Sequence, residues 1–467
     1  MTGTREGGFG IPAAYFNAPA GVGNQVYFQE SYNMRPYISR RDLLKQAALA
    51  GAATLIGSSA KASRSPNDKL NIACIGVGGQ GASDLGNVSS ENIVAMCDVD
   101  AARAADSFNR FPNSKKYTDF RRMLDQQKDI EAVVVSIPDH CHAPAAVMAM
   151  KMGKHVYCQK PLANSVAECR SMTQVAAAHP KIVTQMGTQN HSHPSYCRVV
   201  ELIQAGAIGP VREAHVITDR PIWPQGMPKP TDTPSVPATL SWDLWLGPAR
   251  ARPYHPSYLP FVWRGWWDFG TGALGDMACH LMDPTFWALN LGAPSAVEAT
   301  CDALLPDSGP KWSVITYEFP IRGDQPAMKL VWYDGGKTPG PDVLGSITLK
   351  KDFNGTIYIG DKGKIYIEHG QMPELLPSAK FADYKGPAET LTRTPGHHKE
   401  WINAIKNGGV TGSRFSFAGP MTEALLLGNV ALRVGKRIEW DAESMVAKDC
   451  PEADKYIRYE YRRGYRL

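Results

Sequence analysis

A continuous apolar run that leads directly into spaced glycines constrains the fold of this chain more than any other feature. The stretch "LNIACIGVGGQGASDLGNV" (70–88) begins with apolar residues at almost every position, which is typical of a strand buried on both faces of a parallel sheet. Gly76, Gly78 and Gly81 follow with the spacing G-x-G-x-x-G. The first glycine permits a tight turn, the second lets the backbone approach a pyrophosphate, and the third lets the next helix pack closely. The sequence therefore predicts a strand, a phosphate-binding turn and a helix whose N-terminus faces a dinucleotide.

A carboxylate stands where such a turn needs one for the ribose. The apolar run "IVAMCD" (93–98) ends in Asp98, about 20 residues after the first glycine, where its side chain can accept hydrogen bonds from both ribose hydroxyls. No arginine follows Asp98 immediately to bind a 2′-phosphate, so NAD is favoured over NADP. The alternative interpretation is a glycine-rich turn beside a solvated aspartate, and the preceding strand pattern argues against it.

Strand and helix patterns then alternate along the chain. Helical patterns cover 101–111, 119–127, 143–153 and 165–178, and apolar strand patterns cover 131–138, 155–158 and 181–186. This alternation predicts a parallel, doubly wound α/β domain over residues 69–189. Ligands of such sheets bind beyond the carboxyl ends of the strands. Lys160 lies just past one of these ends and is followed by Pro161, which restrains the chain, so we expect Lys160 at the ligand crevice. A surface lysine is the alternative if the motif is taken alone.

The second half of the chain begins with an unusual aromatic segment. Residues 220–268 are rich in proline and hold most of the eleven tryptophans. The segment is too irregular for a regular element and too aromatic for a disordered linker. We expect a wall built from loops, whose flat rings suit the C–H faces of sugars, with Trp263, Arg264 and Trp267 at the ligand.

Later segments alternate between apolar and polar residues and break at glycines. These segments are 313–320, 327–335, 345–353 and 355–370. Period-two alternation is typical of strands with one buried face. We therefore expect an α+β domain over residues 190–467, built on an open, largely antiparallel sheet.

Residues 1–62 are interpreted as an N-terminal extension with an export signal. The stretch 39–62 joins a twin arginine, Arg40 and Arg41, to a run of small apolar residues and ends in an A-x-A-like cleavage site at Ala62. It resembles a bacterial twin-arginine signal, which predicts export of the folded protein to the periplasm by the twin-arginine machinery. The run is too short and too small-sided to span a bilayer, so no stable membrane anchor is expected. An amphipathic surface helix is the alternative.

Charge and cysteine usage argue against two other classes of function. The net charge is +5 over 467 residues, and no dense stripe of Lys and Arg accompanies it, so nucleic acid is a poor partner. The nine cysteines are scattered without a C-x-x-C pair, so neither a zinc site nor a redox dithiol is expected.

Four further segments carry a resemblance to a known family. In their order and spacing, "SIPDHCHA", "VYCQKPL", "MGTQN" and "GALGDMACHLMD" resemble the Gfo/Idh/MocA oxidoreductases, and the resemblance covers nearly everything from residue 69 onward. It implies a Rossmann domain and a second domain whose sheet covers the active site and forms homo-oligomers. It also implies that the lysine of a Glu-Lys-Pro motif sits at the nicotinamide and touches the reacting hydroxyl.

Lys160 matches that lysine, but Gln159 stands where the motif has glutamate, which changes the charge beside the site. Asp276 and His280 match a second pair of the family, one helical turn apart on one face. The resemblance implies that the imidazole takes the hydroxyl proton and that the carboxylate supports the imidazole. A metal-binding pair or a surface salt bridge are the alternatives, although no third metal ligand is evident nearby.

The motifs and the resemblance together define an expected site without a metal. The expected catalytic residues are Lys160, Asp276 and His280, and the expected substrate contacts are Asn190, Trp263, Arg264 and Trp267. The expected cofactor contacts are Gly76, Gly78, Gly79, Gln80, Gly81, Asp98, Pro138, His142, Lys160 and Gln189. For His142, a place in a helix-capping loop is the alternative.

The resemblance implies an exported, NAD-dependent oxidoreductase that acts on a secondary hydroxyl of a sugar, glycoside or cyclic polyol. Export of the folded protein is consistent with an NAD that stays tightly bound. An alternative is an NAD-dependent glycosidase, lyase or epimerase that oxidises its substrate transiently and recycles the cofactor internally. A non-catalytic sugar-binding protein is the third possibility, and the retention of Lys160, Asp276 and His280 argues against it.

Overall fold

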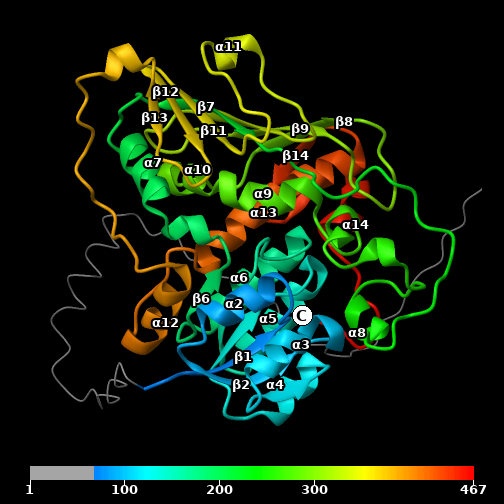
Figure 1. Ribbon diagram of the computed structural model, residues 1–467. Helices are drawn as coiled ribbons and strands as arrows, with labels where there is room; N and C mark the ends of the chain where they lie inside the picture. The colour runs from blue at the N-terminus through cyan, green and yellow to red at the C-terminus, as the bar shows by residue number, and fades with distance from the viewer. Residues whose placement is uncertain (1–67) are drawn as a thin grey trace, which may run out of the picture. The chain divides into compact units, whose positions relative to one another are not determined.

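The continuous apolar runs of the first half form one parallel sheet. The elements of this domain are, in chain order, β1 (Asn71–Ile75), α2 (Gln80–Asn87), β2 (Asn92–Cys97), α3 (Ala101–Arg110), β3 (Lys115–Tyr117), α4 (Phe120–Gln126), β4 (Ala132–Val135), α5 (His142–Lys151), β5 (His155–Cys158), α6 (Val166–Ala178) and β6 (Thr184–Met186). The six strands lie in the order β3-β2-β1-β4-β5-β6, and every neighbouring pair is parallel (Figure 1). β4 is buried throughout, as expected for a strand covered on both faces. The predicted doubly wound α/β domain is confirmed.

The strand order reverses between β1 and β4, which lie side by side at the centre of the sheet. Ligands of doubly wound sheets bind beyond the strand ends at such a reversal. The glycine-rich turn follows β1, and Pro138 follows β4. The fold therefore places both segments at the crevice where a dinucleotide binds.

The computed structural model describes residues 68–467, and the predicted export signal and cleavage site lie outside them. The described residues belong to one unit of the chain. No helix among them combines the length and the apolarity that crossing a bilayer requires. The nine cysteines are unpaired, and all but Cys301 are buried.

The alternating segments of the second half form a nine-stranded sheet in the order β13-β12-β11-β7-β10-β9-β8-β14-β15. Its strands are β7 (Val211–Ile217), β8 (Ala296–Cys301), β9 (Ser313–Phe319), β10 (Met328–Tyr333), β11 (Gly355–Gly360), β12 (Gly363–Glu368), β13 (Glu374–Leu376), β14 (Ile438–Asp441) and β15 (Val446–Lys448). β7 and β10 are parallel, and the other neighbouring pairs are antiparallel. The predicted α+β domain with a largely antiparallel sheet is confirmed.

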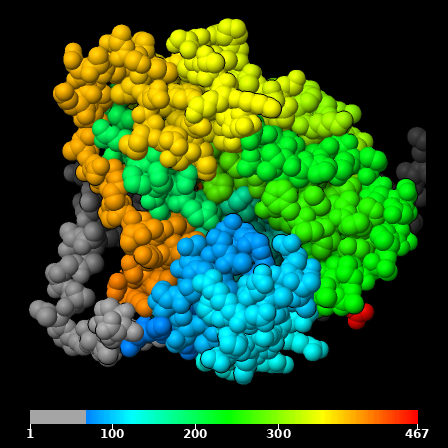
Figure 2. Space-filling model, viewed as in Figure 1, coloured from blue at the N-terminus to red at the C-terminus, as the bar shows by residue number. Residues whose placement is uncertain are grey.

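The helices of the second half pack against this sheet and against the first domain. They are α7 (Pro194–Gln204), α8 (Trp242–Leu246), α9 (Gly272–Leu281), α10 (Asp283–Leu289), α11 (Pro341–Leu344), α12 (His397–Asn407), α13 (Phe415–Val434) and α14 (Asp454–Ile457). α13 contacts α6 of the first domain as well as α9 and β8, and α12 contacts α2 (Figure 1). Two late helices thus return to the Rossmann domain. In Figure 2 the surface of that domain, blue to cyan, meets the green Pro- and Trp-rich segment along a seam.

One predicted strand is wrong, and another is shorter than expected. Residues 345–353 form no strand, although their apolar residues alternate. Ile347, Leu349 and Phe353 instead pack with Ile357 in a small apolar cluster. Phe353 is buried and Ile347 and Leu349 are partly buried by contact with the sheet rather than by a place in it, so the pattern does not require backbone pairing. Of the strand predicted at 181–186, only the part that forms β6 (Thr184–Met186) is a strand in the structure.

Candidate active site

The glycine-rich turn after β1 leaves no room for side chains. Gly76 adopts φ +78°, and a Cβ there would lie 2.2 Å from the carbonyl oxygen of Ser136. A Cβ on Gly81 would lie 2.1 Å from the carbonyl oxygen of Gly76, and one on Gly78 would lie 3.0 Å from that of Arg103. The turn therefore holds the N-terminus of α2 against the end of β4 and leaves its backbone open to a ligand.

Asp98 stands beside this turn, directly after β2. Its Oδ2 accepts the Val77 N–H at 2.9 Å, and its Oδ1 accepts the Asp100 N–H at 3.0 Å. Burial raises the pKa of Asp98, although these N–H groups and Arg103 act in the opposite direction. Arg103 lines the same cavity as Asp98. The sequence prediction did not include Arg103, because it lies in the first turn of α3 rather than directly after Asp98.

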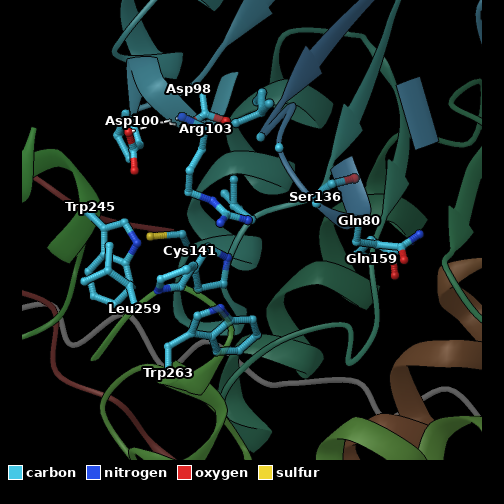
Figure 3. A pocket seen from close by; sticks show the side chains of 18 of the residues that line it. Gln80, Asp98, Asp100, Arg103, Ser136, Cys141, Gln159, Trp245, Leu259 and Trp263 are labelled. Carbon is cyan, nitrogen blue, oxygen red and sulfur yellow. Dashed lines mark hydrogen bonds between the residues drawn. The ribbon is translucent and has the colours of Figure 1, made fainter. Parts of the chain in front are cut away.

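The Pro- and Trp-rich segment closes the other side of this cavity, whose volume is about 380 Å³ (Figure 3). The Ala101 N–H donates to the Thr239 carbonyl at 2.9 Å, and the Ser241 N–H donates to the Val99 carbonyl at 2.8 Å. These backbone bonds tie the segment to the loop that follows Asp98. The aromatic and apolar side chains that the segment places in the cavity wall include Trp245, Leu259 and Trp263.

A second cavity, of about 420 Å³, adjoins the first at Lys160. Gln80, Gln159, Lys160 and Phe261 line both cavities, so the two form one crevice. Lys160 thus stands where the dinucleotide space meets a second, more polar space. The strand-end position of Lys160 in the sequence predicted this placement at the crevice.

Asp276, on α9, is the partner of Lys160 rather than of His280. Lys160 Nζ donates to Asp276 Oδ1 at 2.7 Å and to the Asp276 carbonyl at 2.8 Å. Arg264 Nε donates to the same Oδ1 at 3.1 Å, and Arg220 Nε lies 3.5 Å from Oδ2. Burial acts to raise the pKa of Asp276, but the charges of Lys160 and Arg264 hold it well below its usual value. Three cations thus contact this carboxylate, and its charge also acts to raise the pKa of His280, so the expectation that Asp276 supports the imidazole stays a prediction.

His280 lines the second cavity. Its Nδ1 is buried and has no hydrogen-bond partner within the described part of the chain. Burial and the charge of Lys160 lower the pKa of His280 well below 6.5. The imidazole is therefore neutral at neutral pH, which is the state that accepts a proton.

A second imidazole, His369, lines the same cavity, and the sequence prediction did not include it. Its ring centroid lies 5.5 Å from that of His280, and its Nδ1 lies 2.9 Å from the Tyr196 hydroxyl. Burial and the charges of Lys160 and Arg220 lower the pKa of His369 to about 4. Two neutral imidazoles and a lysine therefore surround this space.

Two family models match the chain. One, described as the oxidoreductase family with an NAD-binding Rossmann fold, matches residues 70–188, and one for the C-terminal alpha/beta domain of the family matches residues 223–327. The chain belongs to the Gfo/Idh/MocA oxidoreductase family.

Similar proteins include dehydrogenases of sugars and polyols. An inositol 2-dehydrogenase from Salmonella typhimurium is 30% identical over 145 residues, which are 30% of this chain and 43% of that protein. A glycosyl hydrolase family 109 protein from Solibacter usitatus is 31% identical over 193 residues, which are 37% of this chain and 43% of that protein. The chain thus matches less than half of the length of either relative. A solved levoglucosan dehydrogenase in complex with NADH and L-sorbose has the same fold, with a TM-score of 0.54 and 19% identity over 80% of this chain and 99% of the other.

The first cavity of this Gfo/Idh/MocA chain fits NAD. α2 begins after Gly79 without a side-chain cap, so its start is open to a pyrophosphate, although the N–H groups of Gly81 and Ala82 donate to carbonyls of the turn at 3.1 Å. Asp98 offers its carboxylate to a ribose, and Pro138 and Lys160 line the wall near the second cavity. The domain is an NAD-binding Rossmann domain.

Four predicted contacts, Gly81, His142, Asn190 and Trp267, lie outside the lining of both cavities. His142 is 1% exposed, with Nδ1 2.8 Å from the Pro161 carbonyl and Nε2 2.7 Å from the Ile137 carbonyl. It holds the turn after Lys160 against the end of β4 and does not face the cofactor. Trp267 is 6% exposed and lines a separate, small cavity beside α13.

The "MGTQN" segment borders the second cavity rather than the first. Gln189, predicted as a cofactor contact, is among the residues that line the second cavity. Asn190, predicted as a substrate contact, is not in that lining, and its Nδ2 lies 3.2 Å from His369 Nδ1. Asn190 therefore reaches the cavity through His369.

Strand ends supply the polar residues that the prediction missed. Arg220 follows β7, Asn354 precedes β11, Glu368 ends β12 and His369 follows it, and all four line the second cavity. The period-two segment 355–370 predicts the strand margins near Asn354, Glu368 and His369, whereas the sequence analysis predicts no strand before Arg220. Within residues 68–467, no group of three or more His, Cys, Asp or Glu side chains is arranged to hold a metal ion.

Proposed function

We propose that this protein is an NAD-dependent oxidoreductase that acts on a secondary hydroxyl of a sugar, glycoside or cyclic polyol. The observation that carries the proposal is the position of Lys160, which lines both the cavity that fits NAD and the polar cavity beside it. A residue at this join can touch a substrate hydroxyl while the cofactor lies on its other side. When bound, NAD supplies the acceptor for the hydride that leaves the carbinol carbon.

The side chains where the two cavities meet have different roles in binding the hydroxyl and accepting its proton. Lys160, held by Asp276 at 2.7 Å, is placed to bind the reacting hydroxyl and to stabilise negative charge on its oxygen. The neutral imidazole of His280 lines the second cavity and accepts the hydroxyl proton. The charges of Lys160 and Arg264 keep the Asp276 carboxylate ionised, so this carboxylate holds Lys160 in place.

The walls of the second cavity suit a polyhydroxylated ring. Trp223 and Phe261 offer apolar surface, and Gln189, Asn354 and Glu368 offer hydrogen-bond acceptors. A sugar ring presents C–H faces to the first kind of wall and hydroxyls to the second. Two similar proteins, an inositol 2-dehydrogenase and a levoglucosan dehydrogenase in complex with NADH and L-sorbose, support this substrate class.

The test follows the absorbance of reduced nicotinamide after neutral sugars and cyclic polyols are added to the purified protein with NAD. An increase that persists until an acceptor is added supports net oxidation. The matched control is the variant Lys160→Met, which should show little or no increase. If no member of the panel changes the absorbance and none is consumed, the proposal is refuted.

The second candidate is transient oxidation with internal recycling of NAD, as in a glycosidase, lyase or epimerase. The observation that favours it is His369, a second neutral imidazole, because such reactions also remove a proton from carbon. A glycosyl hydrolase family 109 protein is among the relatives. Consumption of a glycoside without a lasting absorbance change would support this candidate over the first.

We also propose that the protein is exported to the periplasm by the twin-arginine route and acts there as a homo-oligomer. Arg40 and Arg41 support export, and the resemblance to the family supports assembly through the second sheet. Changing both arginines to lysine should leave the folded precursor in the cytoplasm. Secretion at the normal rate would refute the route, and a monomeric mass by light scattering would refute the assembly.

A further inference from the structure

A carboxylate without solvent exposure lies behind the join of the two cavities. Asp84, on α2, is 0% exposed. Gln80 Nε2 donates to it at 3.0 Å, the Ser136 hydroxyl at 2.7 Å and Gln159 Nε2 at 2.9 Å, and His398 Nε2 lies 3.1 Å from it. These partners come from α2, the end of β4, the end of β5 and α12. The buried carboxylate of Asp84 therefore contacts side chains from each of these four segments.

The surroundings of Asp84 keep it ionised. Burial acts to raise its pKa, but hydrogen bonds from His398, Ser136 and Gln159 lower it overall. A buried carboxylate is tolerated when its oxygens are satisfied in this way. The charge of Asp84 is thus a stable part of the site at neutral pH.

Asp84 also fixes the orientation of two side-chain amides that line the crevice. Gln80 and Gln159 both line the two cavities, and each uses its Nε2 to reach Asp84. Each amide therefore has its carbonyl oxygen left for other partners (Figure 3). The Gln159 Oε1 accepts the backbone N–H of Lys160 at 3.3 Å.

The position of Gln159 leaves little freedom for another orientation. A Cβ on Gly187 would lie 2.7 Å from the Gln159 Oε1, so the neighbouring strand end packs directly on this amide. Gln159 is itself only 5% exposed. The chain Asp84, Gln159, Lys160 is therefore a fixed connection from α2 to the reactive end of β5.

We propose that Asp84 is a positioning residue, which supplies from α2 the negative charge that the Glu-Lys-Pro motif carries before its lysine. Through Gln159 it fixes Lys160, and through both amides it presents hydrogen-bond acceptors at the join. The part that concerns turnover rests on the proposed function, because it assumes that Lys160 acts on a substrate hydroxyl. The part that concerns the cofactor does not, because the amides line the NAD cavity whatever the substrate is.

The test exchanges the charge between the two positions. Asp84→Asn removes it, Gln159→Glu places two carboxylates against each other, and the double variant Asp84→Asn/Gln159→Glu carries one carboxylate at the motif position. The dissociation constant of NADH is measured by fluorescence, and turnover is measured with the sugar that gives the largest absorbance change. We expect each single variant to weaken NADH binding and to lower turnover by about tenfold or more, the scale of a lost hydrogen bond to a charged group. We expect the NADH dissociation constant and the turnover of the double variant to lie within about threefold of the wild-type values.

The matched control is Glu91→Gln. Glu91 is 8% exposed, accepts the Leu70 N–H at 2.6 Å and pairs with Lys406 of α12 at 2.8 Å, but it lines neither cavity. The Glu91→Gln substitution should lower thermal stability and leave NADH binding unchanged. The proposal is overturned if Asp84→Asn behaves like this control, or if the double variant is no better than the worse single variant.

A second variant keeps the test decisive if Asp84→Asn does not fold. Gln159→Met leaves the carboxylate its other three partners and removes the connection to Lys160. Wild-type NADH affinity and turnover in this variant would overturn the proposal. If no sugar is turned over by any variant, the proposed function fails, while the NADH measurements still decide the role of Asp84.

Discussion

Replacing Asp276 with asparagine removes a negative charge that three cations face. The carboxylate lies 2.7 Å from Lys160 Nζ, 3.1 Å from Arg264 Nε and 3.5 Å from Arg220 Nε. Asparagine keeps the shape and one oxygen acceptor but leaves the three positive charges unbalanced. Removing one partner of a buried ion pair typically costs about 3–5 kcal/mol. Because the three cationic side chains are 15%, 20% and 22% exposed, we expect the lower end, about 3 kcal/mol, in the free energy of unfolding.

The effect of Asp276→Asn on turnover shows whether Asp276 acts through Lys160 or through His280. Without its anchor, Lys160 no longer holds one position at the join, and we expect turnover to fall by about 100-fold, equivalent to about 2.7 kcal/mol. The assay is the rate of NADH formation in a double-mutant cycle of Asp276→Asn and Lys160→Met. If Asp276 acts through Lys160, adding Asp276→Asn to Lys160→Met changes the rate little.

The opposite outcome would restore the role expected from the sequence. If Asp276→Asn lowers the rate equally with and without Lys160, its carboxylate serves His280 instead. Asp219→Asn is the control, because Asp219 pairs with Arg220 and has no contact with Lys160 among the described ion pairs. An Asp276→Asn variant with the unfolding free energy and turnover of the wild type would refute the reasoning.

Three further changes test other parts of the crevice. Asp98→Ala should raise the dissociation constant of NAD by about tenfold or more and leave that of NADP unchanged or lower, because the carboxylate repels a 2′-phosphate; equal weakening of both cofactors in binding titrations would contradict this. Because burial lowers the pKa of His280, the base stays neutral as the pH falls, and the acidic limb of the rate profile should lie below pH 6.5; His280→Ala should abolish that limb and lower turnover about 100-fold or more. Trp263→Ala should weaken NADH binding measured by fluorescence, since Trp263 lines the cofactor cavity. Trp267→Ala should leave NADH binding unchanged while costing about 3–5 kcal/mol in denaturant unfolding, as expected for a buried tryptophan.

The first domain could be predicted in detail because its signals are local. Continuous apolar runs, the glycine spacing and Asp98 all lie within short windows, and each has a direct steric or hydrogen-bonding cause. The segment 345–353 shows where local reasoning fails. Its alternating apolar residues pack against the sheet without joining it, and this outcome depends on a partner surface that no local pattern contains.

The site shows the same division between local and distant information. Strand-end position placed Lys160 at the crevice, and helical spacing placed Asp276 and His280 on one element. The pairing of Asp276 was not predictable, because Arg220 and Lys160 reach it from segments far along the chain. A carboxylate four residues from an imidazole pairs with it only when no stronger cation is closer.

The second cavity draws its reactive groups and its outer wall from different parts of the fold. Lys160 and His280 stand on the end of β5 and on α9, whereas Asn354 and Glu368 stand at the margins of β11 and β12. On the proposed function, substitutions at those margins change the shape and the acceptors that the substrate meets while the NAD cavity stays as it is. Substrate choice could then change through a few substitutions at strand ends, with Lys160 and His280 retained.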